Sequence, residues 1–211
     1  MRVETMEKRL HQAGALAALI AAIALYSGIW RGRHHAKGRV MGPAPTVARI
    51  LVEGNQAVYA GAGVGATAVL YLLWHPLRAS LPASVRVAAT IAGALLYFPG
   101  LTIMVWGRVA MGDMHNVSSS LAVQLYADHR LVTSGPFAVV RHPMYVGGIM
   151  AELGALLLFR TWAVLLISCN APMLLMRAGR EEQALAAEFG KQWVDYTTRV
   201  PGWIPRLGKA S

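Results

Sequence analysis

Long apolar runs alternate with short polar segments along the whole chain. Three runs are mostly apolar, each close to the roughly 20 residues that a helix needs to cross a bilayer: Gly14–Trp30, Gln56–Trp74 and Ala83–Trp106. Two shorter runs, Tyr145–Phe159 and Thr161–Met176, are separated only by Arg160 and predict a tight helical hairpin. The pattern therefore predicts an all-α, multi-pass membrane protein with about five transmembrane helices.

The composition excludes an ordinary soluble domain, because 55% of the 211 residues are hydrophobic and only 14% are charged. A formal net charge of +10 is also found in nucleic-acid-binding proteins. Here, however, the Lys and Arg residues lie in short clusters beside apolar runs, which is typical of segments that face anionic lipid. We therefore expect membrane lipid, and not nucleic acid, as the partner. The single cysteine, Cys169, offers no disulfide, and no spacing indicates a metal site.

The basic residues predict an orientation. With five helices and an external N-terminus, Gly107–Met144 and the segment after Met176 lie on one face, which carries most of the Arg and Lys residues. By the positive-inside rule this face is cytoplasmic. The abundance of Ala, Gly and Arg favours a prokaryotic plasma membrane. We expect a single domain, in which residues 1–106 supply three helices and residues 107–211 carry the chemistry.

Two polar clusters flank the predicted hairpin and should meet on that face. The first is Arg141-His142-Pro143-Met144-Tyr145, and the second contains Arg177, Glu181 and Glu182. Helical spacing places Tyr145, Gly148 and Glu152 on one face, and Asn170, Arg177 and Glu181 on another. Two polar faces on adjacent helices predict a pocket. The later residues Leu185, Phe189, Trp193 and Tyr196 predict an amphipathic helix after Glu182 that covers its mouth.

Several segments together resemble a known family. They are Leu131–Phe137, Arg141–Gly147, Arg177 with Glu181-Glu182, Phe189-Gly190, Tyr196 and Val200-Pro201. In order and spacing they resemble the isoprenylcysteine carboxyl methyltransferase and phospholipid methyltransferase superfamily, although Phe137 replaces the tyrosine that usually follows the Gly-Pro pair. The resemblance implies a small helical membrane domain with S-adenosylmethionine in a cytoplasmic pocket that the C-terminal segment closes. It also implies a lipophilic or lipid acceptor that enters from the bilayer.

The resemblance also implies roles for individual residues. Arg141, His142, Pro143 and Tyr145 match the His-Pro loop that holds the cofactor, and Glu181 and Glu182 match the acidic pair that takes its ammonium or ribose hydroxyls. Arg177 matches an arginine suited to orient an anionic acceptor. Gly148 and Tyr196 complete the expected cofactor site, although Gly148 also suits close helix packing. Glu152 lies outside the family motif, and acceptor-site chemistry and a buried structural pair remain equal alternatives for it.

Other interpretations stay open at this point. The chain is alternatively a membrane reductase that uses NADPH, or a non-catalytic membrane binding protein. Arg177 and Glu181 also have the spacing of an ordinary exposed helix pair, Trp193 and Trp203 suit an interfacial aromatic belt, and the role of His115 is undecided. The acceptor is a prenylated cysteine, a phospholipid amine or a small thiol or apolar metabolite. The composition favours a lipid or a small apolar molecule.

Overall fold

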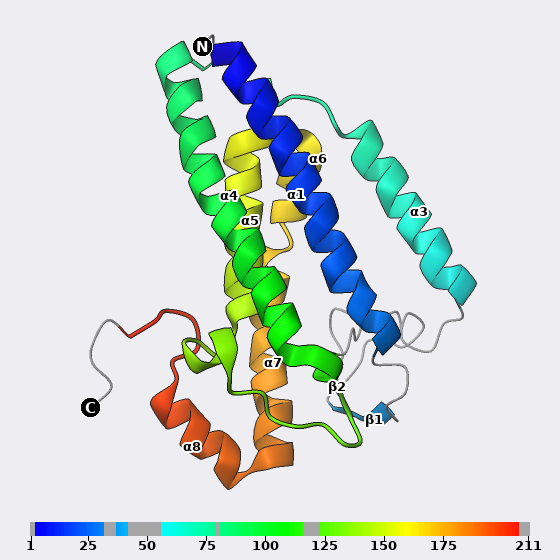
Figure 1. Cartoon of the computed structure of the whole chain (residues 1–211). Helices are drawn as coiled ribbons and strands as arrows, with labels where there is room; N and C mark the ends of the chain where they lie inside the picture. Colours follow the sequence, from blue (N-terminus) through cyan, green and yellow to red (C-terminus); the bar gives the residue numbers. More distant parts are fainter. Residues whose placement is uncertain (1–2, 32–36, 42–55, 79–80, 116–122, 207–211) are drawn as a thin grey trace.

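The computed structural model describes residues 3–31, 37–41, 56–78, 81–115 and 123–206. These residues form a bundle of long helices with a smaller polar region at one end (Figure 1). The helices are α1 (Val3–Arg31), α3 (Gln56–Leu72), α4 (Ala83–Met111), α5 (Pro143–Phe159), α6 (Trp162–Ser168), α7 (Ala171–Phe189) and α8 (Lys191–Arg199). Two 3-10 turns, η2 (Gly112–Met114) and η3 (Gly135–Ala138), and two strands, β1 (Lys37–Met41) and β2 (Val123–Tyr126), complete the fold.

The centre of the bundle is the α4–α5 pair, which packs through glycines. Gly93, Gly100 and Gly107 recur every seven residues on α4, and on α5 they face Gly154, Gly147 and Met144 respectively. A Cβ atom at Gly100 would lie 2.6 Å from the backbone nitrogen of Ala151 and 2.7 Å from the oxygen of Gly147. Only small residues permit so close an approach of two backbones, as in many membrane helix pairs. The packing of α4 against α5 therefore positions the first turn of α5, which lies at the polar end of the bundle.

A partly buried ionic cluster ties α1 to this pair at the opposite end. The Glu7 side chain is only 14% exposed, and its Oε1 atom accepts from Arg160 Nη2 at 3.1 Å and from Thr90 Oγ1 at 3.2 Å. The Nε atom of Arg86 lies 3.4 Å from the same oxygen. Arg160 has a left-handed backbone, with φ of 50°, where the chain leaves α5. The N-terminal helix is therefore fixed to the turn between α5 and α6.

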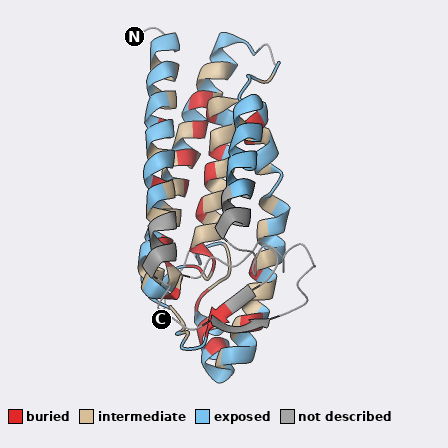
Figure 2. Ribbon diagram, turned by 90° about the vertical axis from the view of Figure 1, so that its right-hand side faces the viewer, coloured by how far each residue is buried: buried red, intermediate tan, exposed pale blue. Residues whose placement is uncertain are grey.

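The outer faces of the helices are apolar and exposed, whereas the buried residues lie along their inner faces (Figure 2). Leu95 on α4 is 69% exposed and Ile23 on α1 is 61% exposed. Among the described residues, two segments have the length and composition to cross a membrane, Ala83–Met114 and Trp162–Phe189. The helical fold agrees with the sequence prediction. The count of about five spans and the cytoplasmic orientation stay predictions.

A small sheet accompanies the predicted helices, because β1 and β2 pair as an antiparallel two-stranded sheet in which Lys37 lies opposite Tyr126. One prediction about local structure was wrong, because the amphipathic helix expected after Glu182 is not one element. Instead α7 continues to Phe189, Gly190 turns the chain with φ of 46°, and α8 begins at Lys191. The turn at Gly190 directs α8 back towards the start of α5.

Candidate functional site

The C-terminal segment lies along the chain that enters α5. The backbone nitrogen of Arg141 donates to the oxygen of Pro201 at 2.8 Å, and that of His142 donates to the oxygen of Gly202 at 3.1 Å. Pro143 occupies the first turn of α5, where its missing N–H leaves no helical bond unmade, and it is fully buried. The polar end is thus built from the start of α5, the second half of α7, α8 and the residues that follow α8.

The Glu182 carboxylate on α7 accepts hydrogen bonds from the side chains of both Arg141 and His142. Its Oε1 atom accepts from Arg141 Nη2 at 2.8 Å and from Arg141 Nε at 3.0 Å, and His142 Nε2 lies 2.8 Å from the same oxygen. The Nη1 atom of Arg141 donates to the oxygen of Val200 at 2.8 Å. The side chains of Arg141 and His142 are 16% and 5% exposed, and that of Glu182 is 30% exposed. Such charge-assisted bonds hold a shielded site more firmly than neutral ones.

Glu181 belongs to a second, separate chain of hydrogen bonds. The Tyr145 hydroxyl donates to Glu181 Oε2 at 2.8 Å and accepts from Arg177 Nε at 2.9 Å. The two side chains of α7 are therefore bridged by a phenol from α5, which the spacing on α7 alone did not predict. Tyr145 fixes both neighbours in place through its single oxygen.

A small, partly open cleft lies beside these residues. Its lining combines side chains from the end of α4, the segment between β2 and α5, α7 and α8: Met111, His129, Leu131, Val132, Phe137, Arg141, His142, Glu181, Leu185, Trp193 and Tyr196. The Tyr196 hydroxyl donates to the oxygen of Phe137 at 2.7 Å, so it holds η3 while its ring faces the cleft. Burial raises the pKa of Tyr196 to about 12, which keeps the phenol neutral.

Both tryptophans assigned to an aromatic belt lie in the site, so that interpretation was wrong. Trp193 is 6% exposed, and the Arg141 guanidinium carbon lies 5.9 Å from the centre of its ring. The ring of Trp203 lies 5.1 Å from that of His142 and 6.4 Å from that of Tyr145. Trp203 therefore supports the Arg-His-Pro segment from the side of the C-terminal segment.

Two of the expected site residues lie away from these bonds. Gly148 faces apolar atoms, with Leu174 Cδ1 and Met104 Sδ each 4.0 Å from the position of a Cβ atom. Glu152 is two turns, about 10 Å, along α5 from Tyr145. Its Oε2 atom is buried without a hydrogen-bond partner among the described residues, and its backbone oxygen accepts from Ser168 Oγ at 3.4 Å. A paired structural role is therefore not seen for this carboxylate.

His115 lies close to the arginines that border the site. Burial, reinforced by Arg108 and Arg177, lowers its pKa to about 4 and keeps the imidazole neutral at neutral pH. Arg108 is 4% exposed, and its Nη1 atom donates to the oxygen of Gly112 at 2.9 Å, which closes the end of α4. Among the described residues, no cluster of His, Cys, Asp and Glu side chains is arranged to hold a metal ion.

The apolar helical bundle, with its ionic and aromatic site at one end, has the features of a helical membrane protein that carries a polar site. Residues 94–187 match the model of the isoprenylcysteine carboxyl methyltransferase (ICMT) family. This match agrees with the resemblance that the motifs in the sequence indicated. The matched segment contains the Arg-His-Pro cluster and the acidic pair, whereas Trp193 and Trp203 lie beyond it.

Individual relatives cover parts of the chain. It is 39% identical over 82 residues to the protein-S-isoprenylcysteine O-methyltransferase of Schizosaccharomyces pombe, which is 38% of this chain and 35% of that protein. It is 30% identical over 101 residues to the cobalt-zinc-cadmium resistance protein CzcN of Cupriavidus metallidurans, 47% of this chain and 46% of that protein. The structure of the eukaryotic intramembrane Ras methyltransferase ICMT aligns with a TM-score of 0.49 at 21% identity, over 76% of this chain and 60% of that one. The chain spans about half or less of the length of these two curated relatives.

Proposed function

We propose that the protein is an S-adenosylmethionine-dependent methyltransferase that acts on a lipophilic or membrane-presented acceptor. The observation that carries the proposal is the pair of carboxylates, Glu181 and Glu182, which the side chains of Arg141, His142 and Tyr145 hold beside a cleft. The match of residues 94–187 to a family of methyltransferases supports the same activity. The site would face the cytoplasm at the end of about five spans.

The residues of the cleft fit such a cofactor. Most of the side chains that line the cleft are apolar or aromatic, as in other small-molecule sites, and a few polar groups lie among them. Glu181 lines the cleft and receives one bond from Tyr145, so its carboxylate suits an ammonium group. Glu182 accepts hydrogen bonds from Arg141 and His142 and so orients both side chains. When bound, S-adenosylmethionine supplies a methyl group on a positively charged sulfur.

Transfer of a methyl group to a nucleophile is an in-line displacement, so the protein contributes alignment and a preorganised electrostatic environment. Arg177, held by Tyr145, is positioned to orient an anionic group of the acceptor. Glu152 lies farther along α5, and its buried carboxylate oxygen has no hydrogen-bond partner within the described part of the chain, which suits an acceptor that carries an N–H or O–H donor. The lipophilic part of the acceptor would lie against the apolar outer faces of the helices and enter from the bilayer.

Ligand binding to the detergent-solubilised chain tests the proposal. We expect S-adenosylmethionine and S-adenosylhomocysteine to raise the melting temperature and NADPH to leave it unchanged. At a hundred times its Kd a ligand adds about 2.7 kcal/mol to stability, which a thermal shift resolves. A shift with NADPH alone would assign the chain to the membrane reductases, and no shift with any of the three would support a non-catalytic role. Radiolabelled methyl transfer to extracted lipids then identifies the acceptor.

A further inference from the structure

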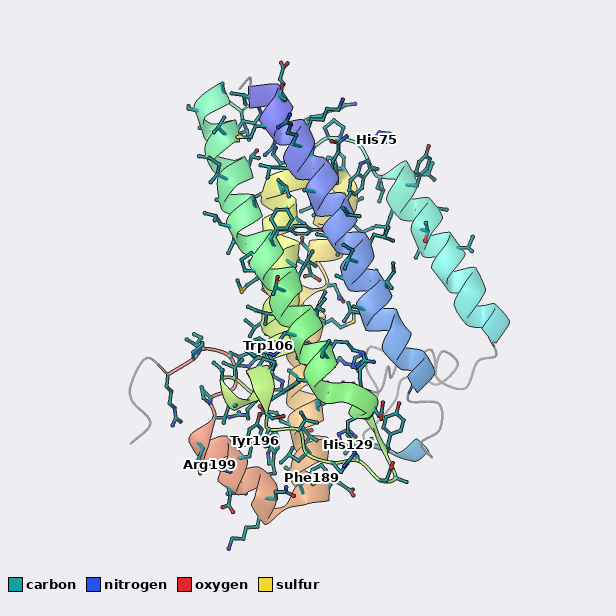
Figure 3. All side chains as sticks on the ribbon, in the orientation of Figure 1. His75, Trp106, His129, Phe189, Tyr196 and Arg199 are labelled. Carbon is teal, nitrogen blue, oxygen red and sulfur yellow. The ribbon has the colours of Figure 1, made fainter. Side chains whose placement is uncertain are left out.

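The helix α5 meets the α6–α7 pair along a seam that carries polar contacts at two levels. At the polar end of the bundle, the Tyr145 hydroxyl on α5 accepts from Arg177 Nε on α7 at 2.9 Å. About two turns further along α5, Ser168 Oγ at the end of α6 donates to the backbone oxygen of Glu152 at 3.4 Å. Figure 3 labels Tyr196 at the polar end, from which α5 runs towards the opposite end of the bundle. The second level therefore lies within the helical bundle, away from the polar end.

The surface between these two levels is apolar and loosely packed. Gly148 lies on this face of α5, and a Cβ atom there would lie 4.0 Å from both Leu174 Cδ1 and Met104 Sδ. By contrast, a Cβ atom at Gly147 would lie 2.6 Å from the backbone oxygen of Gly100. The helix α5 therefore packs tightly on α4 at Gly147, whereas its face at Gly148 leaves room for an added group beside apolar side chains.

Glu152 is an ionisable residue on the apolar helix α5. Its Oε2 atom is shielded from solvent and has no hydrogen-bond partner among the described residues. The Ser168 hydroxyl donates to the backbone oxygen of Glu152 and not to the carboxylate. An ionisable group in an apolar helix is costly, and a shielded oxygen without a donor adds to that cost. A ligand that donates a hydrogen bond to this oxygen is therefore favoured.

The chain that packs beside Glu152 interrupts its helix. α6 ends at Ser168 and α7 begins at Ala171, and both lie in the segment Trp162–Phe189, which is long and apolar enough to cross a membrane. Pro172 has no N–H, so the backbone oxygen of Ser168, one helical turn before it, lacks its usual helical donor. Irregular backbone at membrane depth is tolerated where it faces protein or lines a polar cavity. The break thus supplies a second accepting oxygen near the level of Glu152.

We propose that Glu152 and the α6–α7 break bind a second polar group of the acceptor, an O–H or N–H donor carried on its lipophilic part. The inference rests on the proposed function and narrows the class of acceptor. The donor lies about 10 Å, two turns of α5, from the group that Arg177 orients. The oxygens of Glu152 and Ser168 at this level accept hydrogen bonds, so the ligand must donate. An acceptor with a plain hydrocarbon chain leaves the carboxylate without a donor and binds less tightly.

Two carboxylic acids that differ in a single hydroxyl test this inference. Decanoic acid offers a carboxylate to Arg177 and a plain chain, whereas ω-hydroxydecanoic acid adds a hydroxyl at the far end of a chain whose extended length is close to two turns of α5. In lipid nanodiscs with S-adenosylhomocysteine bound, we expect the parent chain to bind the hydroxylated acid about tenfold more tightly, the effect of one hydrogen bond. Glu152→Leu should bind the two acids equally.

Two further variants complete the comparison. Glu152→Gln keeps an accepting oxygen without the charge, so it should retain part of the preference for the hydroxylated acid, and it carries the test if Glu152→Leu does not fold. Glu188→Leu, which removes an exposed carboxylate of α7, is the matched control and should keep the parent preference. Because the described residues supply no partner for Glu152 Oε2, Glu152→Leu should melt at or above the temperature of the parent.

Calorimetry against empty nanodiscs gives each Kd, and thermal melting of each ligand-free variant reports on its fold. Equal affinities of the parent for the two acids, or no binding of either, would overturn the second polar site, as would a preference that survives in Glu152→Leu. A lower melting temperature of Glu152→Leu would also overturn it, because the carboxylate would then hold the bundle together. In each of these cases the binding of S-adenosylhomocysteine leaves the proposed function standing. A parent that does not bind S-adenosylhomocysteine contradicts the proposed function itself.

Discussion

The two adjacent acids on α7 should respond differently to the same substitution. Glu182 receives three donors on one oxygen, two from Arg141 and one from His142, whereas Glu181 receives the neutral hydroxyl of Tyr145. Glu182→Gln keeps an accepting oxygen but removes the charge that balances the guanidinium. We expect this variant to loosen the polar end of the bundle. Glu181→Gln should leave the polar end intact and act on ligand binding.

The size of the effect follows from the bonds. A hydrogen bond to a charged group contributes about 1.5–3 kcal/mol, and a neutral one about 0.5–1.5 kcal/mol. The Glu182 side chain is 30% exposed, so solvent screens part of this difference. Because the bonds weaken without being lost, we expect Glu182→Gln to destabilise the polar end by about 1–2 kcal/mol. That corresponds to a roughly 5- to 30-fold increase in local opening.

Hydrogen exchange measures this opening at two defined amides. The N–H groups of Arg141 and His142 are bonded to the oxygens of Pro201 and Gly202, so they exchange only when the C-terminal segment separates. Both amides should exchange faster in Glu182→Gln and at the parent rate in Glu181→Gln, the matched control one residue away. Equal exchange in the two variants would refute the division of roles between the acids, and so would an unchanged rate in Glu182→Gln.

Two further substitutions test the site and the scaffold. Arg177→Lys replaces a planar fork by a point charge, so kcat should fall about tenfold or more while the Kd of S-adenosylhomocysteine changes less; a larger loss of binding than of turnover would place Arg177 with the cofactor. Gly100→Ala adds a Cβ atom 2.6 Å from the backbone of α5, so it should destabilise the protein by about 1–3 kcal/mol in detergent melting. Gly63→Ala, with no atom within 4 Å of the added carbon, is its control, and equal melting temperatures would contradict the close α4–α5 packing.

Helical spacing predicted the parts of the site that lie on helices. Tyr145 was placed on one face of α5, and Arg177 and Glu181 on one face of α7, and the structure joins the three through two hydrogen bonds. Such spacing is reliable because a helix fixes which residues share a face, whatever the rest of the fold does. Helical spacing does not predict, however, how many turns of a helix face belong to the site. Glu152 shares the face of Tyr145 but lies two turns away from the bonded groups, about 10 Å.

The contacts made by irregular chain were not predictable in this way. The pairing of Arg141 and His142 with Pro201 and Gly202 joins two segments without regular secondary structure, and no periodicity marks them. His129 is likewise on a connection between elements. The aromatic residues illustrate the same limit, because Trp203 in a polar tail has the composition of an interfacial anchor. Only its packing on His142 identifies it as part of the site.

Arg141 links the family segment to the residues that lie beyond it. Two of its donors bind Glu182, inside the matched range of residues 94–187, and a third binds the oxygen of Val200, outside that range. Because one guanidinium makes all three bonds, its orientation towards the acidic pair depends on the position of the C-terminal segment. The same segment carries Trp203, which packs against His142 and Tyr145. The ionic side of the cleft is therefore complete only when residues 200–203 are in place, so its geometry is a property of the folded polar end and not of the matched segment alone.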